Sequence, residues 1–481
     1  MQYTGYRYSE VDDDRCVLWG DVLKNDYGDS ALDACCYCNG GLVGNNMFPS
    51  IVPSTFLPHS SVPSAMSSNT YYDSLKAIYE ATNGNVWVSD TNWISESPLC
   101  SWYGLSCDEK ERLISMDLSK NGLEGYLPSS IGSLTHLTYL GLERNTLYGT
   151  LPSEIGYLSS LEVINLSYNY FSGPLPIQLG SLGSLQSLRL NFNSFTADIP
   201  SEIGLLTNLT YLNMRNNGLR GMIKTELGQL KNLEYLNLRF NNLSGTLPSE
   251  LFELHQMVFF NLHANNLYGT IPSEIGLMTK LNYLDLSGNY LNQDLPAEIY
   301  RLTSIKYLYL NFNSLSGNVA TEVGLLNDLV SFDVHENSLE GSLPTEIGQL
   351  SKLTYLYFSR NVLVGTIPSE IGLLSSLEIL GLNSNNLEFQ VPSHLGSITN
   401  LTAIYLHDNE LTRELPSEIG LLSKLKYLSF YGTGITKVPD EICNLHEDNM
   451  GLIQYLHISE GMAVETNCSH LLTPLFPMIY M

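Results

Sequence analysis

Four cysteines near the start of the chain have the residue type and the closeness that a metal site needs: Cys16, Cys35, Cys36 and Cys38. Zinc is held by thiolates and imidazoles, but this spacing does not match a zinc knuckle and no histidine lies near. An even number of cysteines suits two disulfides in a secreted protein. The spacing therefore favours disulfides of open connectivity over zinc, and we predict no metal site.

Catalytic residues would have to lie together, and the sequence offers no such group. The segment 28–31 resembles the Gly-Asp-Ser motif of a hydrolase family, but no partner histidine lies near it. His263, His335 and His407 share one repeat position, yet three repeats separate them, roughly 14 Å at ~4.8 Å per strand, which is too far for one metal. No P-loop, zinc-protease, esterase or kinase signature occurs. We predict no enzymatic activity and no cofactor.

The elements that position these side chains follow from a repeat of 24 residues. An asparagine marks each copy, and apolar residues precede it by three, five and eight positions, as Leu286, Leu284 and Leu281 precede Asn289. This is the pattern of a leucine-rich repeat. A fourteenth copy has Thr433 at the asparagine position. The marking asparagines are Asn121, Asn145, Asn169, Asn193, Asn217, Asn241, Asn265, Asn289, Asn313, Asn337, Asn361, Asn385 and Asn409.

One copy of such a repeat cannot bury its own apolar face, so copies must stack into a solenoid with a continuous core. In the x-L-x-L-x stretch the Leu residues point inward and their neighbours outward, which predicts one long parallel sheet with a solvated face. The asparagine amide can satisfy backbone groups where the chain turns after the strand. Thr433 has fewer hydrogen-bonding atoms, and we expect the array to end there.

The segment after each asparagine identifies the type of repeat. The unit Asn265–Asn289 reads NNLYGTIPSEIGLMTKLNYLDLSGN and closely resembles the plant-type leucine-rich repeat. The resemblance covers about residues 70–470. It implies an α/β-type solenoid, a right-handed superhelix of about 14 repeats whose concave sheet binds a ligand, with a short second strand in the G-x-I/L-P segment. Lys224 and Ala320 replace the proline in two copies, which leaves the predicted fold unchanged.

Charge excludes two classes of partner. The 481 residues carry a formal net charge of −26, which argues against nucleic acid and anionic membranes, because both require basic surfaces. A glutamate nine residues after the asparagine could form a cation-binding strip, but it fits better the first turn of a short helical segment, where it complements the helix dipole. This glutamate row is Glu154, Glu202, Glu226, Glu250, Glu274, Glu298, Glu322, Glu346, Glu370 and Glu418.

We predict five segments: a cysteine-rich module (1–41), a Pro/Ser-rich linker (42–68), an N-terminal cap (69–112), the repeats (113–432) and a C-terminal cap (433–481). The module resembles one found in algal, particularly diatom, surface proteins, and this resemblance implies no activity. In the N-terminal cap, Leu75, Ile78 and Tyr79 mark one face of an amphipathic helix.

Four further cysteines flank the repeats. Cys100 and Cys107 stand in CSWYGLSC, which resembles the cysteine-pair cap of plant-type repeats and implies a disulfide. Cys443 and Cys468 follow the last repeat, and we predict that they close the other end, because a solenoid exposes its core at both ends. Reduced buried thiols are the alternative.

The cysteines indicate an extracellular or cell-surface protein, but the chain begins without a visible signal segment. We therefore expect an upstream signal or a membrane anchor that is missing from this chain. Asn-x-Ser/Thr acceptor motifs are compatible with secretion. The predicted glycosylation sites are Asn165, Asn208, Asn242, Asn400 and Asn467.

The outward positions of repeats four to nine carry aromatic, arginine and asparagine side chains, the composition of binding hot spots. An alternative is that the aromatic residues only stack as cross-strand neighbours and stabilise the sheet. The predicted ligand-binding residues are Arg189, Tyr211, Asn213, Arg215, Tyr235, Asn237, Arg239, Phe259, Asn261, His263, Tyr283, Tyr307 and Tyr309.

These features predict a recognition protein that binds an extracellular peptide, protein or glycan on its concave face. An inhibitor of a secreted hydrolase, similar to the polygalacturonase-inhibiting proteins, would use the same face. An ice- or surface-binding protein would use a regular polar array, whereas the outward positions here vary between repeats. The arginines imply an acidic or hydroxyl-rich ligand.

Overall fold

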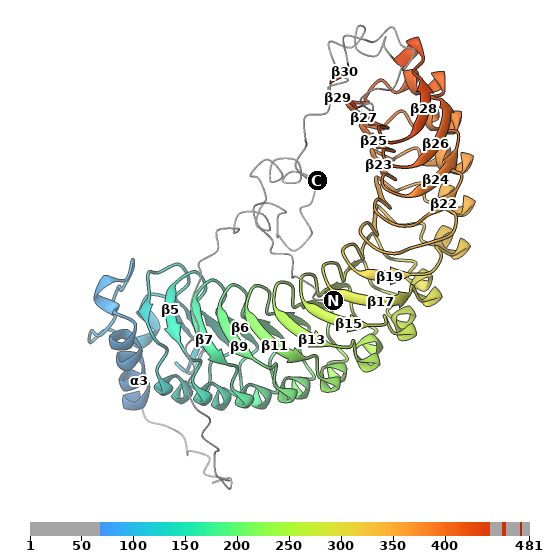
Figure 1. Cartoon of the computed structure of the whole chain (residues 1–481). Coiled ribbons are helices and arrows are strands. Elements are labelled where there is room, and N and C mark those ends of the chain that lie inside the picture. Colours follow the sequence, from blue (N-terminus) through green and yellow to red (C-terminus); the bar gives the residue numbers. More distant parts are fainter. Residues whose placement is uncertain (1–67, 443–454, 458–471, 474–481) are drawn as a thin grey trace, which may run out of the picture. The chain divides into compact units, whose positions relative to one another are not determined.

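The computed structural model of the chain describes residues 68–442, 455–457 and 472–473. Within them the polypeptide winds through successive coils, most of which have a strand of the main sheet, a strand on the flank and a 3₁₀ helix on the outer side (Figure 1). The cysteines at 16, 35, 36, 38, 443 and 468 and the acceptor Asn467 lie outside the described residues.

In the described residues the main sheet has 17 strands. The first pair is antiparallel and every later pair is parallel. The strands are β1 (Leu105–Cys107), β2 (Leu113–Asp117), β4 (Tyr139–Gly141), β6 (Val163–Asn165), β8 (Ser187–Arg189), β10 (Tyr211–Asn213), β12 (Tyr235–Asn237), β14 (Phe259–Asn261), β16 (Tyr283–Asp285), β18 (Tyr307–Tyr309), β20 (Ser331–Asp333), β21 (Tyr355–Tyr357), β23 (Ile379–Gly381), β25 (Ala403–Tyr405), β27 (Tyr427–Ser429), β29 (Tyr455–His457) and β30 (Leu472–Thr473). The sheet thus continues by two strands past the predicted end at Thr433.

The flank carries a nine-stranded and a four-stranded sheet. Their strands are β3 (Glu124–Gly125), β5 (Thr146–Gly149), β7 (Tyr170–Pro174), β9 (Ser194–Ala197), β11 (Gly218–Met222), β13 (Asn242–Gly245), β15 (Asn266–Gly269), β17 (Tyr290–Asp294), β19 (Ser314–Ser316), β22 (Val364–Gly365), β24 (Asn386–Phe389), β26 (Glu410–Glu414) and β28 (Gly434–Lys437). Most of these strands begin before the G-x-I/L-P segment in which the second strand was predicted and extend only into its first one or two residues, as β15 ends at Gly269. The proline instead precedes the 3₁₀ helix in an extended conformation, as Pro272 does.

The 3₁₀ helices form the third row of each coil. They are η3 (Ser129–Ser133), η4 (Ser153–Tyr157), η5 (Ile177–Ser181), η6 (Ser201–Leu205), η7 (Thr225–Gln229), η8 (Ser249–Glu253), η9 (Ser273–Leu277), η10 (Ala297–Arg301), η11 (Thr321–Leu325), η12 (Thr345–Gln349), η13 (Ser369–Leu373), η14 (Ser393–Ser397) and η15 (Ser417–Leu421). The glutamate row lies in their first turns, as predicted. Lys224 and Ala320 take the proline's extended conformation, and η7 and η11 form normally.

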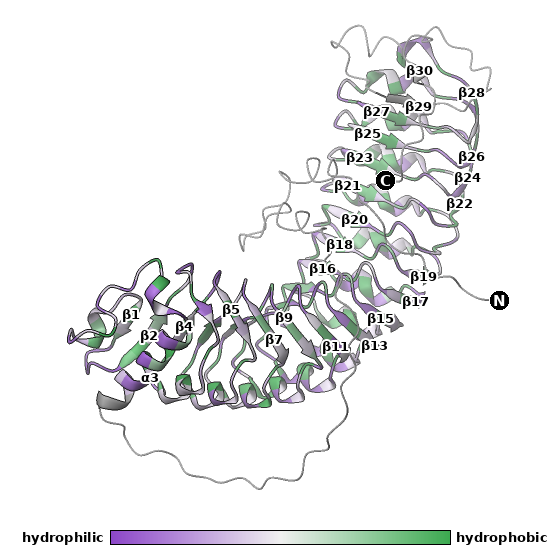
Figure 2. Cartoon of the chain, turned by 60° about the vertical axis from the view of Figure 1, so that its left-hand side comes forward, coloured by the Kyte–Doolittle hydropathy of each residue, from purple (hydrophilic) through white to green (hydrophobic). Residues whose placement is uncertain are grey.

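The core recurs from coil to coil. Leu267, Ile271, Ile275, Leu281 and Leu284 of one repeat are all at most 3% exposed. Figure 2 shows hydrophobic residues at matching places in successive coils. Each coil therefore completes its core only against its neighbours, as the repeat pattern predicts.

A helix and two short turns precede the first coil and pack against it. Helix α3 (Ser68–Ala81) buries Leu75 and Ile78 as predicted, and the short 3₁₀ turns η1 (Gly84–Val86) and η2 (Leu99–Ser101) follow it. The predicted disulfide between Cys100 and Cys107 is present.

Candidate ligand-binding face

The main sheet places aromatic side chains of successive repeats directly beside one another. Its register pairs Tyr211 with Tyr235, Tyr235 with Phe259, and Phe259 with Tyr283. The paired rings are almost parallel, with centroids 4.2 Å, 4.3 Å and 4.4 Å apart. At its end the stack loosens into a tilted contact between Tyr283 and Tyr307 at 6.0 Å. We call Tyr211, Tyr235, Phe259, Tyr283, Tyr307 and Tyr309 the aromatic stack.

Stacking buries several residues that the alternation pattern predicted to be solvated. Tyr235 is 1% exposed and Phe259 is 6% exposed, because each ring lies between the rings of two neighbouring strands. The other aromatic residues of the stack are half-buried, and Arg189 is exposed. The face is therefore solvated only in part, and the aromatic residues do stack as cross-strand neighbours, which was the alternative interpretation. The buried members of the predicted set are Asn213, Arg215, Tyr235, Asn237, Phe259 and Asn261.

The three predicted arginines lie against aromatic rings. The guanidinium carbon of Arg189 lies 4.7 Å from a ring centroid of the aromatic stack. That of Arg215 lies 4.8 Å from the Phe192 centroid, and that of Arg239 lies 4.4 Å from the Phe240 centroid. A guanidinium in this position is held by the ring quadrupole and keeps N–H groups at its edge.

Phe192 and Phe240 belong to a row that sequence reasoning missed. We call Tyr168, Phe192, Phe240 and Phe312, each directly before a marking asparagine, the rim aromatics. All four have a left-handed backbone with φ of 53–55°, which bulky residues rarely adopt. Their sequence signal was an aromatic residue at a turn position that most other repeats fill with a small, polar or charged residue.

The strand-end asparagines have a structural role. The side-chain oxygens of Asn213, Asn237 and Asn261 accept hydrogen bonds from backbone N–H groups two residues later, at 3.2 Å, 3.1 Å and 2.9 Å. The Asn237 amide also donates to the Tyr235 hydroxyl at 3.1 Å. These contacts stabilise the turn after the strand, so these amides are only partly available to a ligand.

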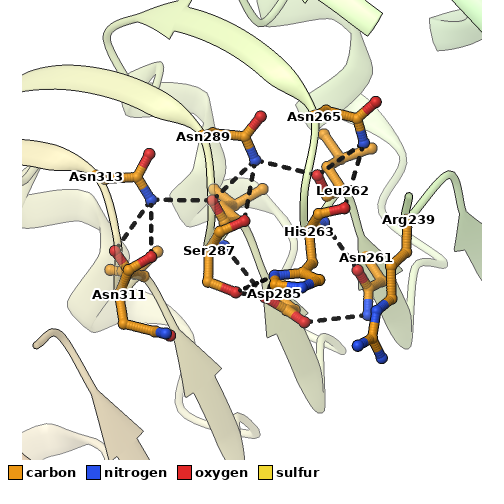
Figure 3. Close-up of polar contacts among 12 residues, drawn as sticks. Arg239, Asn261, Leu262, His263, Asn265, Asp285, Ser287, Asn289, Asn311 and Asn313 are labelled. Carbon is orange, nitrogen blue, oxygen red and sulfur yellow. Dashed lines mark hydrogen bonds and ion pairs between the residues drawn. The ribbon is translucent and has the colours of Figure 1, made fainter. Parts of the chain in front are cut away.

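A polar cluster lies at the ends of β14 and β16, beside the aromatic stack (Figure 3). The Ser287 hydroxyl donates to Asp285 at 2.5 Å and lies 2.6 Å from Nδ1 of His263. Because Ser287 has only one proton to donate, Nδ1 of His263 must carry the proton of that contact. Burial lowers the pKa of His263, although Asp285 acts in the opposite direction. Burial also raises the pKa of Tyr283, so its phenol stays a neutral donor.

An open groove of about 510 Å³ lies next to the first residues of β8, β10, β12 and β14. Only polar side chains line it, so it offers hydrogen-bonding groups without an apolar floor. They are Glu162, Ser184, Gln186, Asn208, Thr210, Asn232, Glu234 and Gln256.

The predicted glycosylation sites differ in accessibility. Asn208 and Asn242 are exposed and Asn400 is half-buried. Asn165 is 5% exposed, and its amide donates to Glu143 while its oxygen accepts from Ser167. The Asn165 prediction was wrong for the folded chain, because this acceptor motif overlaps a strand of the main sheet.

The sequence matches a leucine-rich-repeat region model over residues 105–257 and a leucine-rich-repeat model over residues 280–302 and 352–374. The solved leucine-rich-repeat protein LIC12759 of Leptospira interrogans is 33% identical with a TM-score of 0.58, and the match covers 73% of this chain and 84% of that one. The chain belongs to the plant-type leucine-rich-repeat family.

Further similarities link this leucine-rich-repeat chain to receptors. Receptor-like protein 36 of Arabidopsis thaliana is 47% identical over 53 residues, 11% of this chain and 7% of that protein. The PEPR1–AtPEP1 complex is 29% identical with a TM-score of 0.75, covering 81% of this chain and 54% of that one. The plant peptide hormone receptor RGFR1 bound to RGF2 is 31% identical with a TM-score of 0.67, covering 72% and 58%. The chain thus spans about half the length of these two receptor chains.

Membrane-spanning helices and clusters of metal-ligating side chains are both absent from the described residues. None of their helices is long and apolar enough to cross a membrane. No group of three or more His, Cys, Asp or Glu side chains within residues 68–442, 455–457 and 472–473 could hold a metal ion. His263, His335 and His407 instead each contact neighbouring side chains of the sheet.

Proposed function

We propose that this leucine-rich-repeat chain recognises an extracellular peptide or protein, which it binds in extended form across β8 to β18. The observation that supports this most is the combination of the aromatic stack with arginines laid against rings. The stack is rigid and amphipathic, and the guanidinium edges add hydrogen-bond donors, which is the composition of interface hot spots.

The stacking favours a peptide over a glycan on this face. A sugar ring packs on the face of an aromatic ring, but Tyr235 and Phe259 have both faces covered by neighbouring rings. What remains are ring edges, phenol hydroxyls and guanidinium N–H groups. These groups suit the carbonyl and carboxylate oxygens of a peptide.

The similarities support the same class of ligand. RGFR1 is a plant peptide hormone receptor whose structure was solved in complex with RGF2. We propose by analogy that this chain is also extracellular or at the cell surface, with any membrane anchor outside the described helices. The competing hypothesis is that the same face binds and inhibits a secreted hydrolase.

The test is a binding screen of the secreted chain against extracellular peptides and secreted hydrolases, followed by substitution. Arg189→Ala and Tyr307→Ala should each weaken peptide binding by about 1–3 kcal/mol. Arg301→Ala, on the outer η10, and Tyr139→Ala, on the same sheet but outside the stack, are the matched controls. Equal losses from the controls would refute the site, and capture of a hydrolase alone would favour the inhibitor.

A further inference from the structure

A second set of tyrosines lies on the flank of the solenoid, away from the aromatic stack. Five of them on or beside the flank strands are 52–62% exposed, so most of each side chain is in water. We call Tyr126, Tyr148 and Tyr170 the first tyrosine row, and Tyr268 and Tyr290 the second tyrosine row.

The strand register brings the members of each row together. Tyr148 pairs with Tyr170 across β5 and β7, and Tyr268 pairs with Tyr290 across β15 and β17. In the first row the register of β3 and β5 continues to place Tyr126 beside Tyr148. Neighbouring members are therefore on adjacent strands of one flank sheet.

The two rows repeat one arrangement. Tyr268 follows Tyr148 by 120 residues, and Tyr290 follows Tyr170 by the same number, which is five repeats. β5 and β15 are five strands apart in the same nine-stranded sheet. At ~4.8 Å per strand the rows lie roughly 24 Å apart.

The ring faces distinguish these tyrosines from the aromatic stack. Among the ring contacts of the described residues, rings of the stack cover one another at 4.2–4.4 Å, whereas none of the ring contacts involves a residue of either tyrosine row. Cross-strand stabilisation by ring contact therefore does not explain these residues. Gly149 and Gly269 follow the strand tyrosines with φ of +81° and +84°, so the residue directly after each of these tyrosines adds no side chain of its own.

We propose that the two tyrosine rows form a binding surface for a linear, neutral, β-linked polysaccharide. In β-linked glucose units the substituents are equatorial and the axial C–H groups form flat apolar faces. Such a face packs on the electron-rich face of an exposed aromatic ring. Thr150 and Thr270, each exposed and two residues after a strand tyrosine, can hydrogen-bond sugar hydroxyls.

Charge and spacing narrow the class of polysaccharide that this surface can bind. Glu124 and Asp294 lie on the flank strands beside the rows, and the chain is strongly acidic overall, so a polyuronate is repelled and a neutral chain is not. Two platforms on one surface increase the affinity for a polymer that reaches both. An oligosaccharide too short to span them gains no such increase. This surface is separate from the peptide site proposed above and does not depend on it.

The test is affinity electrophoresis of the whole chain in gels that contain soluble barley β-glucan, with polygalacturonate as the charged comparison. Wild type should be retarded by the β-glucan and not by polygalacturonate. The double variant Tyr148→Ala/Tyr268→Ala should bind at least about tenfold more weakly. Tyr148→Phe/Tyr268→Phe should bind as wild type does, because the packing uses the ring face and not the hydroxyl.

The matched control is Tyr157→Ala, which removes a 67% exposed tyrosine from η4, outside both rows. It should leave retardation unchanged, as should Arg189→Ala on the concave face. Circular dichroism melts confirm that each variant folds. Unchanged retardation of the double alanine variant, an equal loss in Tyr157→Ala, or no retardation of wild type would overturn the proposal.

Discussion

At the scale of the residue, the marking asparagines carry the hydrogen bonds that join one coil to the next. The Asn289 amide donates to the carbonyls of Leu262 and Leu286, both at 3.1 Å, and its oxygen accepts from the Leu267 N–H at 3.1 Å. Figure 3 shows the amides of Asn265, Asn289 and Asn313 in this arrangement. Each side chain therefore satisfies backbone groups of its own coil and of the preceding one.

Asn289→Ala should destabilise the chain by about 2–4 kcal/mol, because three buried backbone groups lose a partner at once. Hydrogen exchange should localise the loss to β14–β18. Thr433 offers the matched contrast, since its hydroxyl contacts the Phe430 carbonyl and the Ile435 N–H, which both belong to its own coil. Thr433→Asn should increase protection of β27. Uniform loss over all repeats in Asn289→Ala would contradict the local role.

Because the Tyr235 ring is buried, its removal should change the stability of the chain. Tyr235→Ala removes a ring that is buried between two others, so it should lower the free energy of unfolding by about 3–5 kcal/mol, comparable to Phe→Ala in a core. Urea unfolding measures this. Tyr235→Phe keeps the ring and loses only the contact with Asn237, at a cost of about 1 kcal/mol. A stable, fully folded Tyr235→Ala protein would show that the ring carries little of the packing.

His263 predicts a pH dependence of stability. Burial holds its pKa below the ordinary value of about 6.5, so the unfolded chain binds the proton more tightly than the folded one. The stability that neutral His263 contributes to the folded chain is complete above pH ~6.5 and is lost as the pH falls below this value. Urea midpoints between pH 5 and 7.5 should fall less steeply in His263→Gln. Parallel curves would assign the pH dependence to groups other than His263.

At the scale of the element, the sequence correctly predicted those features that the repeat period determines. The strands, the buried leucines and the glutamates in helical first turns all follow from one pattern copied many times. The predicted flank strand lay too far along the chain, because the proline marks the start of the 3₁₀ helix and not the strand. It also missed that outward residues bury one another, since alternation along one strand says nothing about the rings on the next strand.

The capping disulfide is an element whose removal can be measured. Cys100→Ser/Cys107→Ser should cost about 2–3 kcal/mol, because the closed loop is short. Hydrogen exchange should show the loss in α3, β1 and β2, while β14 stays protected. An even loss along the chain would argue against an end cap. For Cys443 and Cys468 the bridge remains a prediction, which mass spectrometry under non-reducing conditions can check.

At the scale of the whole molecule, the repeat that builds the core also aligns charges of one sign. Glutamates occupy the first turn of every 3₁₀ helix from η7 to η13. Successive coils therefore present like charges on one side of the solenoid. Ion pairs such as Lys231–Glu253 and Lys352–Asp328 link neighbouring coils, but their side chains are largely exposed, and such pairs contribute little.

Salt should therefore stabilise this chain. The Debye length falls from ~30 Å at 0.01 M to ~10 Å at 0.1 M, so added salt screens repulsion between coils. Calorimetry should show a melting temperature that rises by a few degrees between these concentrations. The variant Glu250→Gln/Glu298→Gln/Glu346→Gln, which interrupts the row at alternate coils, should melt higher at low salt and respond less to added salt. A melting temperature that falls with salt would mean that attraction within the ion pairs outweighs repulsion along the glutamate row. The acidic charge would then have to be balanced locally within each coil.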